Sequence, residues 1–336
     1  MIKEAMLYEK IDDRRVHCNL CAHRCVIKPD RRGVCGVREN RDGILYSLVY
    51  GTLIAENIDP IEKKPFFHVL PSSKSYSIAT TGCNFSCEFC QNHEISQTPR
   101  LTRMITGVDL PPAEIVARAK KSGSKTIAYT YTEPTIYFEL AFDTAKIAIE
   151  NGLKNVFVTN GFMTVETIET IAPYLAAANV DLKSFRDEFY KKQCGAGLNP
   201  VLMSLKKMKE MGIWVEITTL LIPTLNDNKE ELNDIAQFIA GLGIETPWHI
   251  SRFYPQFKIQ NLPVTSLSSL HLAAEIGKRA GLKYVYSGNV PGDEGESTYC
   301  FHCGNLLIER LGYKISSINL KGNKCPKCGT ELEGIF

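Results

Sequence analysis

The chain has 336 residues, of which 44% are hydrophobic and 23% charged, as in an ordinary soluble globular protein. Its 39 basic and 37 acidic residues nearly balance, which excludes a strong overall attraction to nucleic acid or to an anionic membrane. No stretch approaches the ~20 apolar residues of a membrane span, and the N-terminus lacks the layout of a signal peptide. We therefore expect a cytoplasmic protein with about two domains, or one α/β barrel with appendages, and with neither membrane nor nucleic acid as a partner.

The first cysteine group lies near the N-terminus, in a C-x2-C-x3-C-x9-C spacing that four cysteines form: Cys18, Cys21, Cys25 and Cys35. Closely spaced cysteines in a reducing compartment indicate a metal site rather than disulfides. Four thiolates close a tetrahedral zinc site or hold an auxiliary iron–sulfur cluster, and the spacing does not separate the two. Of these we favour zinc.

The second group, Cys83, Cys87 and Cys90, follows a strand-like run at Tyr76–Thr80 in a C-x3-C-x2-C spacing. A centre with three protein ligands keeps one position open for a reacting molecule, whereas four cysteines close the coordination shell. The spacing favours an open iron–sulfur centre. The alternative is a zinc site completed by a remote ligand such as His93.

From about residue 75 the chain repeats a short apolar strand, a polar turn and an amphipathic helix. Strands alternating with helices predict a parallel sheet, either a barrel or a doubly wound sheet. Polar residues collect after most strands, where a barrel places its active site, and no G-x-G-x-x-G follows the first strand, so we favour a barrel. The expected strands are Tyr76–Thr80, Thr126–Tyr131, Asn155–Thr159, Val180–Lys183, Ile213–Leu221, Trp248–Phe253 and Lys283–Tyr286.

Helix signals fill the intervals between these strands. Apolar residues at helical spacing predict helices that end at Gly152, that run over 165–175 and that run over 232–239. Asn228 with Glu231 predicts a capping box, and Asn199-Pro200 predicts the start of a helix.

The last group forms two C-x2-C-G knuckles, at Cys300 and Cys303 and at Cys325 and Cys328. Glycine after the second cysteine lets backbone N–H groups approach the thiolates. This arrangement is typical of a zinc ribbon or a rubredoxin-like site, and we expect structural zinc. Because the tail is too small for a large core, we expect its folding to depend on the metal.

The open three-cysteine site at the first strand of an α/β barrel resembles the radical S-adenosylmethionine (SAM) superfamily, including the aromatic Phe89 just before the third cysteine. The resemblance extends over Val158–Gly161, Asn179–Lys183, Pro247–Phe253 and the terminal cysteine groups. Over this length the chain is most similar to the radical SAM component of the AmmeMemoRadiSam system, which is itself similar to pyruvate formate-lyase activating enzymes. The resemblance implies an α/β fold with a partial (β/α)6 barrel at 71–290 between small cysteine-rich metal modules at 1–70 and 291–336.

The resemblance also implies a chemistry. A [4Fe–4S] cluster on Cys83, Cys87 and Cys90 would bind SAM at its free iron, and reduction by an external flavodoxin-like or ferredoxin-like donor would release a 5′-deoxyadenosyl radical that abstracts hydrogen from a substrate. Proteins of the same system are implied as partners. The residues that match SAM contacts of the superfamily are Phe89, Thr132, Glu133, Asn160, Asp181 and Lys183.

Several of these residues have a structural alternative. Thr132-Glu133-Pro134 keeps the glutamate of the superfamily's Gly-Gly-Glu motif without its glycines, and Thr132 or Glu133 would also cap a helix. Asp181 and Lys183 would also form a structural ion pair, and Asn160-Gly161 would also make a plain turn. For the isolated Cys194, the choice is between a buried inert residue and a catalytic thiol. His249 and Arg252 are weaker candidates for the mouth of the barrel.

Three functions follow as hypotheses. The first is a radical SAM enzyme that acts on a small molecule or on a component of its own system. The second is a glycyl-radical activase, which would accept an extended loop of a large partner protein. The third is a non-catalytic iron–sulfur or zinc protein, which leaves the barrel and Glu133 unexplained.

Overall fold

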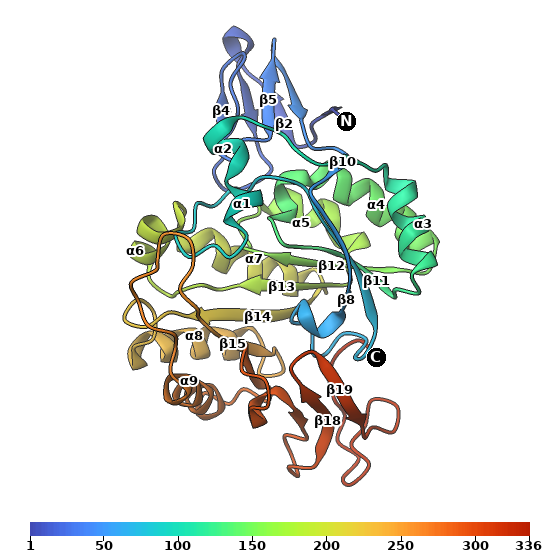
Figure 1. The fold of residues 1–336 in the computed structure, drawn as a ribbon, viewed down its shortest axis with the longest axis vertical. Coiled ribbons are helices and arrows are strands. Elements are labelled where there is room, and N and C mark those ends of the chain that lie inside the picture. The colour runs from blue at the N-terminus through green and yellow to red at the C-terminus, as the bar shows by residue number, and fades with distance from the viewer.

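An eight-stranded sheet runs through the middle of the structure, a computed structural model that describes residues 1–336 (Figure 1). Seven strands are parallel, in the order β16-β15-β14-β13-β12-β11-β9, and β8 (Ala55–Pro60) is antiparallel to β9 at one edge. The parallel strands are β9 (Lys74–Ala79), β11 (Thr126–Tyr129), β12 (Lys154–Thr159), β13 (Ala177–Asp181), β14 (Trp214–Leu221), β15 (Trp248–Arg252) and β16 (Val285–Gly288). All seven expected strands are therefore present, with ends shifted by a few residues.

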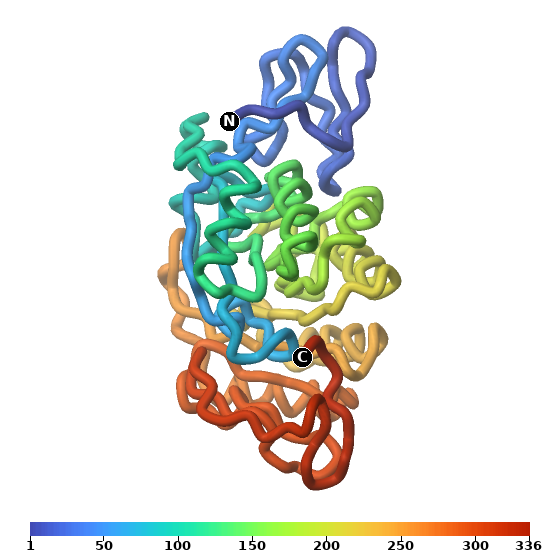
Figure 2. The backbone as a smooth tube through the Cα atoms, turned by 90° about the vertical axis from the view of Figure 1, so that its right-hand side faces the viewer, coloured from blue at the N-terminus to red at the C-terminus, as the bar shows by residue number.

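One long helix follows each of the first six parallel strands and lies outside the sheet (Figures 1 and 2). Six strand–helix units leading to a seventh strand, in a sheet whose edge strands β8 and β16 do not pair with each other, confirm the partial (β/α)6 barrel. The helices are α3 (Pro112–Lys121), α4 (Phe138–Glu150), α5 (Val165–Ile171), α7 (Leu198–Glu210), α8 (Lys229–Leu242) and α9 (Leu267–Arg279). Short helices α1 (His93–Ser96), α2 (Thr98–Thr102) and α6 (Asp187–Phe189) lie in the loops.

The start of α8 illustrates how local sequence sets an element. The Asn228 side chain accepts from the backbone N–H of Glu231 at 3.0 Å, as the predicted cap requires. The reciprocal half of the box is absent, because the Glu231 carboxylate instead accepts from the backbone N–H of Phe185 and from the Ser184 hydroxyl. The Glu231 side chain, which the sequence assigned to the helix end, therefore binds a distant segment instead.

The N-terminal module, used here for residues 1–54, sits at one end of the long axis (Figure 1). Its strands are β1 (Lys3–Glu4), β2 (Tyr8–Lys10), β3 (Val16–Cys18), β4 (Val26–Ile27), β5 (Arg38–Arg41), β6 (Ile44–Ser47) and β7 (Thr52–Leu53), the last paired with β10 (Val108–Asp109). The buried guanidinium of Arg38 forms an ion pair with the buried carboxylate of Glu139 on α4 at 2.5 Å, which ties the module to the barrel. Strand β8 lies before the boundary expected at residue 70 but belongs to the main sheet.

A base segment, residues 61–70, crosses the barrel between its two edge strands. The Glu216 carboxylate on β14 accepts from the backbone N–H groups of Phe67 and His68 at 3.0 and 2.9 Å. The Asn179 amide on β13 donates to the carbonyl of Pro65 at 2.8 Å. These bonds satisfy backbone groups inside the barrel, so an irregular segment can be buried there.

The C-terminal module, residues 291–336, occupies the opposite end of the molecule (Figures 1 and 2). Its antiparallel sheet comprises β17 (Thr298–Tyr299), β18 (Leu306–Leu311) and β19 (Lys314–Ile318). A buried chain of hydrogen bonds attaches it to the barrel. The chain runs from Arg310 to Thr298, then to the Tyr286 hydroxyl, to His68 and to the carbonyl of Glu333. None of the helices has the length and hydropathy that a membrane crossing needs.

The buried ring of His68 should make stability depend on pH. Burial lowers the pKa of His68 from 6.5 to about 4, so the folded chain binds fewer protons than the unfolded chain between these values. The free energy of unfolding should therefore fall as the pH drops from 6.5 towards 4, by about 3 kcal/mol in all, at ~1.4 kcal/mol per pKa unit.

Urea unfolding at several pH values tests this. A His68→Gln variant has no titrating ring at this position. Its midpoint urea concentration should therefore fall less steeply than that of the wild type as the pH drops from 6.5 towards 4. If the urea midpoint fell equally steeply with pH in the two proteins, His68 would not be the group responsible.

Candidate functional site

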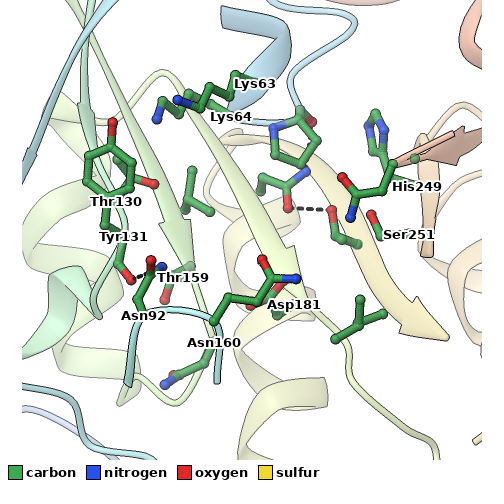
Figure 3. Close-up of a pocket in the computed structure, with 18 of the residues that line it drawn as sticks. Lys63, Lys64, Asn92, Thr130, Tyr131, Thr159, Asn160, Asp181, His249 and Ser251 are labelled. Atoms are coloured by element: carbon green, nitrogen blue, oxygen red, sulfur yellow. Dashed lines mark hydrogen bonds between the residues drawn. The ribbon is translucent and has the colours of Figure 1, made fainter. Parts of the chain in front are cut away.

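One cavity of about 560 Å³ extends from the loop after β9 into the interior of the barrel. Figure 3 shows its polar lining, with Thr130 and Tyr131 on one side, His249 and Ser251 on the opposite side, and Lys63 and Lys64 above them. All nine residues predicted for the cluster or for SAM line the same cavity, although they are up to a hundred positions apart in sequence. They are Cys83, Cys87, Cys90, Phe89, Thr132, Glu133, Asn160, Asp181 and Lys183.

The three cysteines lie on the cluster loop, residues 82–92, which has little regular structure and borrows hydrogen-bond partners from distant segments. The backbone N–H of Ser86 donates to the carbonyl of Cys194 at 2.8 Å, and that of Glu88 to the carbonyl of Gln193 at 2.9 Å. Both carbonyls belong to a π-helical turn at Tyr190–Cys194, and unusual turns of this kind are frequent at functional sites. The loop is therefore held from behind while its thiols line the cavity.

The thiols fit a three-cysteine iron–sulfur centre. Hydrogen bonding with the Cys194 thiol lowers the pKa of Cys87, and nearby Lys183 acts in the same direction against the effect of burial. The Asn84 amide nitrogen is buried beside Cys83 and has no acceptor within the protein, as expected of a donor that faces a bound group. The His93 ring stacks on Phe257 with centroids 4.4 Å apart, and His93 is not among the residues that line the cavity.

The Glu133 carboxylate is buried at the N-terminus of the 3₁₀ helix Pro134–Tyr137. Its Oε1 accepts from the backbone and hydroxyl of Thr135 at 3.0 and 2.5 Å and from the Thr159 hydroxyl at 2.7 Å. Its Oε2 accepts only from the backbone N–H of Asn160, at 2.8 Å. Burial raises the pKa of Glu133 and these donors oppose the rise. The capping alternative is thus present, and Oε2 keeps one acceptor position for a ligand.

Thr132 and Asn160, the predicted SAM contacts next to Glu133, both hydrogen bond to other parts of the protein. The Thr132 hydroxyl donates to the carbonyl of Thr80 at 2.7 Å and so locks the end of one strand to the next. The Asn160 amide donates to the Asn84 side chain at 2.7 Å, beside the cluster loop. Thr132 therefore offers no free hydroxyl proton to a ligand, whereas Asn160 positions the cluster loop.

Asp181 and Lys183 form an ion pair at 2.8 Å in the cavity wall. The strand β13 ends at Asp181, so Lys183 lies after the strand rather than within it, a correction to the expected range Val180–Lys183. The Lys183 ammonium also lies 5.8 Å from the centroid of the Phe89 ring. Burial alone would lower the pKa of Lys183, but Asp181 and the thiolates of Cys87 and Cys194 outweigh it and raise that pKa.

Cys194 is fully buried behind Cys87 and is not among the residues that line the cavity. Burial raises its pKa, and the hydrogen bond to Cys87 adds to that rise. The thiol therefore contacts a cluster ligand rather than the space available to a substrate.

Sequence reasoning missed the part of the lining that comes from the base segment and the C-terminal module. Lys63, Lys64 and Phe67 close the cavity from the base segment, and Gly312 and Tyr313 from the hairpin between β18 and β19. No local pattern marks these residues, because their place in the cavity depends on tertiary packing. His249 does line the cavity and donates to buried Glu216 at 2.6 Å, whereas Arg252 donates to the carbonyl of Thr265 instead.

The four C-terminal cysteines converge on one point. Their Sγ atoms all lie within 4.8 Å of one another, with Cys300 to Cys328 at 3.6 Å and Cys303 to Cys325 at 3.7 Å. A tetrahedral ion with metal–sulfur bonds of about 2.3 Å needs sulfurs about 3.8 Å apart. The C-terminal cysteines therefore fit a single metal ion.

Comparison with known proteins agrees with this architecture. A family model described as the radical SAM superfamily matches residues 77–239. The chain is 46% identical over 335 residues to an uncharacterized protein of Methanocaldococcus jannaschii, with 99% of both chains covered. It is 25% identical over 168 residues to the pyruvate formate-lyase-activating enzyme of Clostridium pasteurianum, which covers 48% of this chain and 67% of that one.

The crystal structure of a radical SAM methyltransferase from Sphaerobacter thermophilus shares the fold. It matches with a TM-score of 0.52 at 18% identity, over 70% of this chain and 71% of that chain. The matched family segment contains the cluster loop, Glu133, Asn160 and the Asp181–Lys183 pair. The chain therefore belongs to the radical SAM superfamily, whose members are enzymes that use a [4Fe–4S] cluster and SAM.

Proposed function

We propose that Cys83, Cys87 and Cys90 hold the [4Fe–4S] cluster, that SAM binds beside it, and that the substrate is a polar small molecule held inside the barrel. The cluster and SAM together supply a 5′-deoxyadenosyl radical that abstracts hydrogen. The chain's own residues bind SAM, orient the substrate and keep water away from the radical.

The continuity of the cavity, from the cluster loop to the C-terminal module, is the observation that carries this proposal. One continuous space joins the cluster loop to Ser287 on β16, and the base segment and Tyr313 border its far part. A volume of about 560 Å³ lies within the 300 to 1,000 Å³ of typical small-molecule sites. A small molecule fits this space better than an extended protein loop, because the base segment and the C-terminal module narrow its far part.

The lining supports a polar substrate. The Asn179 and Thr218 side chains hydrogen bond to each other across neighbouring strands at 2.8 Å, and Glu216 orients the His249 ring. The Lys64 ammonium is buried, pairs with Asp59 at 2.7 Å, and has its pKa lowered by burial to about 8. Fixed polar groups in a water-poor space favour substrates that complete their hydrogen bonds.

The SAM contacts follow from the same geometry. The free acceptor position on Glu133 Oε2 suits the methionine ammonium, and the Lys183 ammonium, held by Asp181, suits an anionic or hydroxyl oxygen. The Phe89 ring offers an apolar surface to the adenine. Support for this set comes from their common place around the cluster loop.

A glycyl-radical activase is the second candidate, and the similarity to the Clostridium pasteurianum activating enzyme favours it. In that case the partner would be a large protein that presents a backbone Cα–H at the mouth of the barrel. Either activity needs an external one-electron donor of the flavodoxin or ferredoxin kind, and proteins of the same system as this chain are proposed partners.

The cluster assignment predicts that the anaerobically reconstituted protein, given dithionite and SAM, forms 5′-deoxyadenosine. A Cys87→Ala variant should lose at least 100-fold of this activity, because a cluster with two protein ligands is not retained. A Met203→Ala variant, altered at an exposed position of α7 away from the cavity, serves as a control and should keep the reaction. Undiminished product from Cys87→Ala would overturn the assignment.

Lys183 should contribute directly to SAM affinity. A Lys183→Met variant keeps the volume and loses the charge, so we expect SAM to bind roughly tenfold more weakly, in line with ~1.5–3 kcal/mol for a charged hydrogen bond. Equilibrium dialysis on cluster-loaded protein measures this. Lys192→Met alters an exposed lysine nearby and should change nothing; equal affinities for all three proteins would remove Lys183 from the SAM site.

The two candidate substrates predict that different fractions of a cell extract stimulate 5′-deoxyadenosine formation. The low-mass fraction of an extract of the source cells should raise the rate of 5′-deoxyadenosine formation above the rate with SAM alone, and the protein fraction should not. Stimulation by the protein fraction alone, together with a glycyl-radical signal in its EPR spectrum, would support the activase instead.

A further inference from the structure

Two lysine side chains of the base segment lie over the cavity, next to Tyr131 (Figure 3). The Lys64 side chain is 2% exposed, and its ammonium lies 2.7 Å from Asp59 Oδ2. The Lys63 ammonium, on a side chain that is 43% exposed, lies 2.8 Å from Oδ1 of the same carboxylate. Two ammonium groups therefore share one carboxylate, which leaves one positive charge in excess. We call Asp59, Lys63, Lys64 and Tyr131 the lysine subsite.

Tyr131 ties the lysine subsite to the cluster loop. Its hydroxyl donates to Asp59, and the Lys64 ammonium lies 4.1 Å from the centroid of its ring. The Asn92 amide of the cluster loop donates to the Tyr131 carbonyl at 2.8 Å. Tyr131 has a φ of +62°, in the left-handed region that bulky residues rarely adopt. Because strained residues of this kind collect at ligand sites, the conformation favours a ligand beside Tyr131.

Two further carboxylates line the far part of the cavity, and both bind backbone N–H groups rather than the lysines. Glu62 accepts from Ser72 at 2.7 Å, and burial raises the pKa of Glu62. Glu296 accepts from Gly292 and Gly312 at 2.9 and 3.0 Å. The lysine subsite therefore keeps its excess positive charge.

Lys64 stays charged in its buried position. Burial lowers the pKa of Lys64 to about 8, with Lys63 acting in the same direction and Asp59 against it, so the ammonium keeps its proton at pH 7. An ammonium has three N–H donors, and a charge in a water-poor space is costly unless it is paired. An anion would supply the missing countercharge, and its oxygens would accept from both ammonium groups.

We propose that the lysine subsite binds a carboxylate or phosphate group of the substrate, which makes the substrate a small organic acid or a phosphate ester. Tyr131 directly precedes Thr132 and Glu133, so the anchored group borders the wall proposed to bind SAM. No bond forms or breaks at the lysines. The role in substrate recognition rests on the proposed function, whereas anion binding is measured without SAM cleavage.

Equilibrium dialysis of the cluster-loaded protein, with SAM present, tests anion binding. Radiolabelled inorganic phosphate and radiolabelled malonate are the probes, and neutral radiolabelled glycerol is the control. We expect a single anion to bind per chain and glycerol not to bind. Tighter binding of phosphate would indicate a phosphate ester, and tighter binding of malonate a carboxylic acid. Binding of neither anion would overturn the proposal.

Substitution of the lysines locates the bound anion. Lys64→Met should weaken its binding roughly tenfold, as the loss of a charged hydrogen bond does. Asp59 would keep Lys63 and Tyr131 as donors in this variant. Lys121→Met alters an exposed lysine at the end of α3 and should leave anion binding unchanged.

A second variant covers the case in which Lys64→Met does not fold. Lys63→Met, at the more exposed position, should weaken anion binding roughly threefold, as the loss of a partly exposed charge does. If the folded variant bound the anion as tightly as the wild type, the lysine subsite would not be the anion site.

SAM also carries a carboxylate, so the SAM affinity of the variants is measured separately. Lys64→Met should bind SAM as the wild type does, whereas Lys183→Met should bind it more weakly. If Lys64→Met lost affinity for SAM and for the anion to the same degree, the lysine subsite would belong to SAM and the assignment to the substrate would be wrong.

The role in substrate recognition is tested with the low-mass fraction of the cell extract. The component that stimulates 5′-deoxyadenosine formation should be retained on an anion-exchange resin at pH 7, and Lys64→Met should reduce its effect roughly tenfold. Stimulation by the unretained part alone would overturn the proposal. If no low-mass component stimulated the reaction, the proposed function would fail, and the dialysis would still decide whether the lysines bind an anion.

Discussion

Three thiols in one short loop must face a single cavity, while the backbone of that loop still needs hydrogen-bond partners. The chain meets both needs by bringing in distant segments. The carbonyls of Gln193 and Cys194 accept from one side of the loop, and the Arg100 guanidinium donates to the carbonyl of Cys83 on another. Because the partners lie far apart in sequence, the cluster loop takes its shape from tertiary contacts rather than from its own sequence.

Buried carboxylates also connect segments that lie far apart in sequence. Glu133 joins the end of β12 to the 3₁₀ helix after β11, Glu216 joins the base segment to β14, and Glu139 joins α4 to Arg38. Each is buried and each has donors from a different element, so removing one partner would leave an uncompensated charge, which costs about 3–5 kcal/mol. Glu133 lines the cavity, Glu216 holds the His249 ring that lines it, and Glu139 holds Arg38, which donates to Cys18 Sγ. Interactions that assemble the fold therefore also fix the functional geometry.

Sequence reasoning recovered what short-range patterns encode. Apolar runs gave the seven parallel strands, and the rule that their carboxyl ends meet brought Cys83, Glu133, Asn160 and Asp181 into one site. It missed Lys64 and Tyr313, because segments with no regular pattern carry them across the barrel. The choice between zinc and an iron–sulfur cluster at Cys18–Cys35 stays a prediction, because spacing in sequence does not determine how far apart four sulfurs lie in space. That distance is a tertiary property.

The two outer cysteine groups lie at different places relative to the cavity. The C-terminal sulfurs fit a single ion, and the small core around them is shared with Phe67, Tyr284 and Tyr286 of the barrel. An ion bound there would also hold Gly312 and Tyr313 against the cavity, because small modules of this kind depend on their metal to fold. The N-terminal cysteines instead lie against the cluster loop, away from the C-terminal module at the other end of the molecule (Figure 1). One site closes the space where a substrate would bind, and the other borders the centre that must be reduced.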